Sequence, residues 1–105
     1  MKQLNICIRK VKHGKFKDSL DIILLDWYED NYRSKLGSFG NVGCKNSGYC
    51  HSMGDYSYFR DSTKQATKQE FENILKAFKE LYGSYEIVIH DRITNKYAEN
   101  ELIGA

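Results

Sequence analysis

The sequence predicts a small α+β domain in which strands pack against two helices. Apolar residues alternate near the start of the chain and again over 85–90, which is typical of half-buried strands. Between these segments, apolar residues recur twice at helical spacing. A chain of 105 residues suits one core, because two cores would each have too little interior. We therefore expect a single domain over residues 1–105.

The first expected element is a strand near the N-terminus. Leu4, Ile6 and Ile8 alternate with polar or small residues, and the pair His13 and Gly14 provides a break after them. Cys7 falls between two isoleucines. Alternation places its thiol on the opposite face, either under a second layer of structure or at a functional site.

A helix is predicted over residues 19–35. Its apolar residues follow the spacing i, i+3, i+4, i+7, i+8; they are Leu20, Ile23, Leu24, Trp27 and Tyr28. Asp18 or Ser19 provides an N-cap and Gly37 a stop. The alternative is a strand over 20–27 that forms a hairpin with the first strand, because periodicity alone does not decide a short apolar run.

Residues 37–54 contain five glycines and have little intrinsic stability, so we expect this loop to be held by a crosslink and to pair in part as a strand. A strand over 56–60 is expected next. Thr67 and Glu70 then form a capping box before an apolar helical stripe that Gly83 ends. With a last strand over 85–90, the element order is compatible with a ferredoxin-like split βαβ arrangement.

Two cysteines and a histidine in the glycine-rich loop predict a structural metal site. Cys44, Cys50 and His51 follow the spacing C-x5-C-H. Zinc takes four such ligands in a tetrahedron, and a glycine-containing connection lets the sulfurs approach one point. The fourth ligand is expected from elsewhere in the chain; the candidates are His13, Cys7, His90 and Asp55. We therefore predict a zinc-stapled loop.

Three alternatives compete with this zinc centre. Cys44 and Cys50 can be small apolar residues under a loop, with His51 at the surface. They can also form a disulfide, which the odd cysteine count and a reducing cytosol disfavour. A cysteine nucleophile activated by a histidine is the third, but no known nucleophile motif surrounds these residues. We therefore expect a protein that is not an enzyme.

Charge is segregated along the chain although its net value is only +2. Residues 1–17 carry six bases and no acid, whereas residues 18–30 carry five acids and no base. The basic segment Arg9–Lys17 suits a phosphate backbone. The acids Asp21, Asp26, Glu29 and Asp30 resemble a strip of phosphates and are candidate contacts to a protein partner.

The chain is expected in the cytoplasm of a host cell. No apolar run approaches the roughly 18 residues that cross a bilayer, and residues 1–5 lead into a strand rather than a signal-peptide core. Eight tyrosines exceed what so small a core can bury. Because tyrosine is enriched in protein interfaces, this favours a binding protein without a small-molecule substrate.

In size, lack of proline and richness in Lys, Glu, Tyr and Asn, the chain resembles phage and mobile-element anti-CRISPR proteins. Those proteins inhibit the RNA-guided nuclease of type II-A systems. The resemblance implies a stoichiometric inhibitor that blocks guide or target-DNA loading, and it assigns no residues. The alternative function is a zinc-containing nucleic-acid-binding module that uses the segment Arg9–Lys17.

Overall fold

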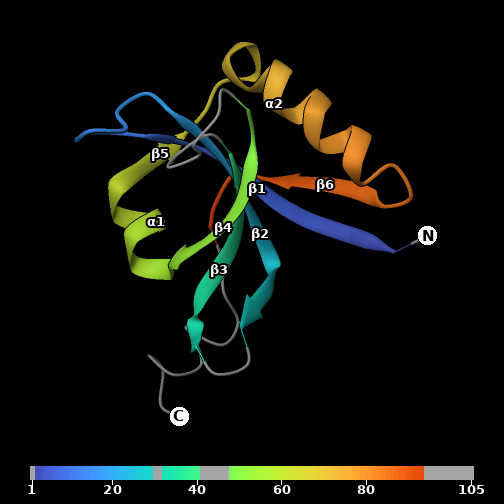
Figure 1. The fold of residues 1–105 in the computed structure, drawn as a ribbon, viewed down its shortest axis with the longest axis horizontal. Helices are drawn as coiled ribbons and strands as arrows, with labels where there is room; N and C mark the ends of the chain where they lie inside the picture. The colour runs from blue at the N-terminus through green and yellow to red at the C-terminus, as the bar shows by residue number, and fades with distance from the viewer. Residues whose placement is uncertain (1, 30–31, 41–47, 94–105) are drawn as a thin grey trace.

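The computed structural model describes residues 2–29, 32–40 and 48–93, with the side chains of 26–29 and 32–35 left aside. Six strands and two helices make up this part of the chain (Figure 1). In chain order they are β1 (Gln3–Val11), β2 (Leu20–Glu29), β3 (Tyr32–Gly40), β4 (Cys50–Asp55), α1 (Tyr56–Ser62), β5 (Thr63–Gln65), α2 (Lys68–Leu81) and β6 (Glu86–His90). The expected α+β class is confirmed.

The six strands form one sheet in which the first four lie in sequence order. Its order is β4-β3-β2-β1, with antiparallel pairing throughout this meander. Two short strands share the other side of β1: β5 runs antiparallel beside Arg9–Val11, and β6 runs parallel beside Gln3–Cys7. The ferredoxin-like arrangement is therefore wrong, because that fold interleaves strands that are joined through helices.

The predicted helix over 19–35 is also wrong, and the hairpin alternative is confirmed. Strand β2 pairs with β1 through a turn, with Lys10 opposite Leu20. Ile22 and Leu24 are buried on one face of the sheet, and Ile23 and Leu25 on the other. A strand that is covered on both faces has a continuous apolar run, and such a run also contains helical spacings.

The segment after the glycine-rich loop differs from prediction in one element. Residues 56–62 form α1 rather than a strand, with Tyr56 and Phe59 on its buried side. The expected strand pairing in the glycine-rich segment is confirmed, because β4 pairs with β3 over Lys35–Gly40.

The predictions for the first strand, the second helix and the last strand hold. Strand β1 and strand β6 lie where the alternation places them. Helix α2 begins with the predicted capping box of Thr67 and Glu70. Its C-cap is Tyr82, one residue before the predicted Gly83. None of the described helices is long and apolar enough to cross a membrane.

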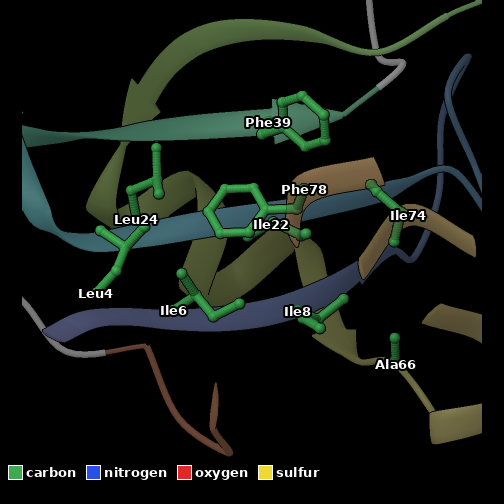
Figure 2. Packing of buried hydrophobic residues seen from close by; sticks show 9 residues of the cluster. All are labelled: Leu4, Ile6, Ile8, Ile22, Leu24, Phe39, Ala66, Ile74 and Phe78. Carbon is green, nitrogen blue, oxygen red and sulfur yellow. The ribbon is translucent and has the colours of Figure 1, made fainter. Parts of the chain in front are cut away.

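Each face of the sheet carries its own core. Helix α2 covers one face, where Phe78 projects between Phe39 of β3 and Ile6 of β1 (Figure 2). Helix α1 covers the other face, where Cys7 packs with residues of β2, β3 and α1. The expectation that Cys7 lies under a second layer is therefore confirmed.

Candidate functional site

An apolar groove lies between strand β4 and the end of helix α2. It has a volume of about 400 Å³. Leu24, Gly37 and Met53 lie in register across three neighbouring strands and form its floor. The remaining lining residues are Ser38, His51, Ser52 and Tyr82. Gly37 has no side chain, so the groove reaches down to the sheet between Leu24 and Met53.

A histidine–tyrosine contact forms one wall of this groove. His51 Nε2 and Tyr82 Oη are hydrogen-bonded at 2.6 Å, and their rings meet edge to face. Phe39 lies beneath them, with its ring centroid 5.2 Å from that of His51 and 5.5 Å from that of Phe78. Burial raises the pKa of Tyr82. The wall therefore joins strand β4 to the end of α2.

Sequence reasoning did not find this groove. The sequence predicts Tyr82 as part of an apolar helical stripe and Gly37 as a helix stop. Met53 is 43% exposed although it belongs to a strand of the sheet. The groove depends on the register of β2, β3 and β4, which no local pattern contains.

The predicted metal ligands do not converge in the described part of the chain. Cys50 and His51 are neighbours on strand β4, so their side chains point to opposite faces of the sheet. Cys50 is bonded in a disulfide, which leaves its sulfur without the negative charge of a ligating thiolate. Cys44 lies outside the described residues. No three His, Cys, Asp or Glu side chains gather as a metal site within the described ranges.

The four candidates for the remaining ligand lie apart. Cys7 is separated from β4 by strands β2 and β3, which places it roughly 14 Å away at the usual strand spacing. Its thiol is free and buried, and burial raises its pKa. His90 contacts Asn5 at 2.8 Å, and His13 is exposed in the turn between β1 and β2. Asp55 is exposed at the end of β4. The zinc centre remains a prediction.

The acidic residues proposed as partner contacts do not form a helical face, because their segment is a strand. Asp21 is only 6% exposed, so its carboxylate does not belong to a surface strip. Its burial raises the pKa to about 7. Asp26 and Glu29 belong to strand β2, but their side chains lie outside the described set, as does Asp30 entirely.

The basic segment Arg9–Lys17 divides into two parts in the structure. Arg9 Nε donates to Thr63 Oγ1 at 2.9 Å, and its Nη2 donates to the Thr63 carbonyl oxygen at 2.6 Å. Lys10 is paired with Glu70. The bases from Lys12 to Lys17 are exposed. Arg9 and Lys10 therefore connect elements of the fold, and only the turn is open to a partner.

Comparison with family models, with curated proteins and with solved structures found no match.

Proposed function

We propose that this protein is a stoichiometric binding protein that inhibits a larger nucleoprotein enzyme by occupying one of its protein surfaces. The groove beside β4 supports this proposal, because it is apolar, exposed and bounded by an aromatic wall. Protein interfaces place such side chains at their centre, where aromatic residues and methionine are enriched.

The groove continues into further exposed apolar surface. Tyr49 is 41% exposed, and its ring centroid lies 5.5 Å from that of Phe39, which also contacts His51 of the groove wall. Strand β4 forms the end of the strand order and pairs with β3 alone among the described strands. An edge strand next to an apolar groove can take an extended segment of a partner by strand addition.

The chemistry of the cysteines also favours binding over catalysis. Cys7 is fully buried with a raised pKa, and Cys50 is in a disulfide. A nucleophilic cysteine needs an accessible thiolate. The class of partner is the type II-A RNA-guided nuclease that the sequence resemblance implies.

Complex formation with such a nuclease tests the proposal. We expect the purified protein to co-elute with the nuclease in size-exclusion chromatography and to inhibit target cleavage at equimolar amounts. Met53→Ser should weaken the complex at least tenfold, because it removes the apolar side chain from the groove floor. Tyr58→Ser is the matched control, since Tyr58 is equally exposed at 43% but belongs to α1.

Complex formation tests the identity of the partner, and the two variants test which surface of the protein it contacts. Absence of a complex with the free, guide-loaded and target-bound nuclease would refute this partner. If Tyr58→Ser weakens the complex and Met53→Ser leaves it unchanged, the groove is not the contact surface.

A further inference from the structure

Basic residues from three separate segments gather at the end of the sheet that holds the β1–β2 turn. The turn contributes Lys12, His13, Lys15 and Lys17, strand β5 contributes Lys64, and α2 begins with Lys68. Strand β5 pairs with β1 so that Lys64 lies beside Lys10, and the Lys12 amide donates to the Ser62 carbonyl at 3.0 Å. We call these six residues the basic end. Figure 1 shows the β1–β2 turn beside β5.

The nearest acids do not neutralise the basic end. Lys10 pairs with Glu70 and lies 3.8 Å from Asp18, while Arg60 holds Asp61 at 2.9 Å. The Lys10 ammonium lowers the pKa of Glu70 to about 2, with the Thr67 bonds contributing. Across the described ranges, Lys15, Lys17, Lys64 and Lys68 have no ion pair. Positive charge is therefore left over at this surface.

The turn itself has a defined shape and carries an aromatic ring. The Lys17 amide donates to Gly14 O at 3.2 Å, and the Asp18 amide donates to Val11 O at 2.9 Å. Gly14 has a φ of 88°, which glycine adopts without strain. Phe16 is 37% exposed on this turn, and Lys15 Nζ lies 5.7 Å from its ring centroid. The Phe16 ring and the Lys15 ammonium therefore lie side by side on the surface of the turn.

We propose that the basic end binds single-stranded nucleic acid. The unpaired lysines neutralise backbone phosphates, whose release of counterions drives association. The Phe16 ring stacks on an unpaired base, which a single strand offers and an intact duplex does not. This site lies on the β1–β2 turn, β5 and the start of α2, away from the residues that line the groove, and the inference does not rest on the proposed function.

Fluorescence anisotropy with a labelled oligonucleotide tests this site in the isolated protein. We expect binding of the single strand to weaken steeply with salt, and Lys15→Gln/Lys17→Gln to reduce the slope of log K against log salt by about 1.4, since each phosphate contact contributes about 0.7. Phe16→Ala should weaken binding roughly tenfold. The matched control is Lys76→Gln/Lys79→Gln, which removes two exposed lysines from the middle and end of α2.

Several outcomes would overturn the inference. These are no binding of the single strand at low salt, equal or tighter binding of the duplex, or an equal loss in the α2 control. Binding to anionic vesicles but not to the oligonucleotide would also overturn it. Formation of the nuclease complex is measured separately, so either proposal can fail while the other stands.

Discussion

Burial sets the chemistry of single residues in this fold, and Asp21 is the clearest case. Its carboxylate is 6% exposed and lies against Gly40, where an added Cβ would come within 2.1 Å of Asp21 Oδ1. Arg9 is its neighbour across strands β1 and β2, but that guanidinium donates to Thr63. Desolvation therefore dominates and raises the pKa of Asp21 to about 7.

This raised pKa predicts that stability falls as pH rises. The folded protein binds the Asp21 proton more tightly than the unfolded chain does. The resulting stabilisation of the folded state is fully present below pH 3.8. It is lost progressively up to about pH 7. The loss is on the order of a few kcal/mol, because each pKa unit corresponds to about 1.4 kcal/mol.

Urea unfolding across this pH range measures the effect. We expect Asp21→Asn to flatten the dependence of the unfolding free energy on pH. Asp18→Asn, at a carboxylate that is 63% exposed, should retain the slope. An Asp21→Asn protein with the slope of the unmodified chain would contradict the assignment.

The burial of Asp21 also shows where sequence reasoning stops for single residues. Alternation in β1 was enough to place Cys7 opposite the isoleucines, and the structure buries it there. The predicted helix over residues 19–35 puts Asp21 on an exposed face, which the structure contradicts. Its burial follows from the register that sets it opposite Gly40, and register is a property of two strands.

At the scale of elements, local signals succeeded for helix α2 and failed for helix α1 and strand β2. Helix α2 has a capping box and a solvent face, and it was predicted almost to the residue. Strand β2 is covered on both faces. Its apolar run therefore matched a helix as well as a strand, and only its partner β1 decides between them.

The contact between β4 and α1 gives a prediction at this scale. A Cβ at Gly54 would lie 2.6 Å from Cζ of Phe59. Phe59 belongs to α1 and is only 3% exposed, because it faces the core between this helix and the sheet. Gly54→Ala should therefore destabilise the protein by about 1–3 kcal/mol through overpacking.

Gly48→Ala is the control for this effect. Gly48 is exposed and an added Cβ there meets nothing within 4 Å. We expect the thermal unfolding temperature of the control to match or slightly exceed that of the unmodified protein. Equal stability of both variants would show that Phe59 of α1 does not pack tightly against Gly54 of β4.

At the scale of the whole molecule, the class was predictable and the topology was not. Counting strand and helix signals indicated an α+β domain. The meander depends on which of two conformations residues 20–29 adopt, and the groove depends in turn on that meander. The candidate site therefore could not be read from local patterns, whereas the lysines and Phe16 of the basic end are visible in the sequence.

The cysteines give the last prediction, because a zinc centre and a disulfide at Cys50 exclude each other. A disulfide within the chain consumes two of the three cysteines. We therefore expect protein that is purified without reductant and then denatured to show one reactive thiol, that of Cys7. Before denaturation this thiol should react slowly, because it is fully buried and its pKa is raised.

Metal analysis of the same sample completes this test. Three thiols together with about one zinc per chain would instead establish the zinc centre and refute the disulfide. Cys7→Ser distinguishes the two states further. It should abolish the single thiol of the disulfide form, whereas in a zinc form that uses Cys7 it should also release the metal.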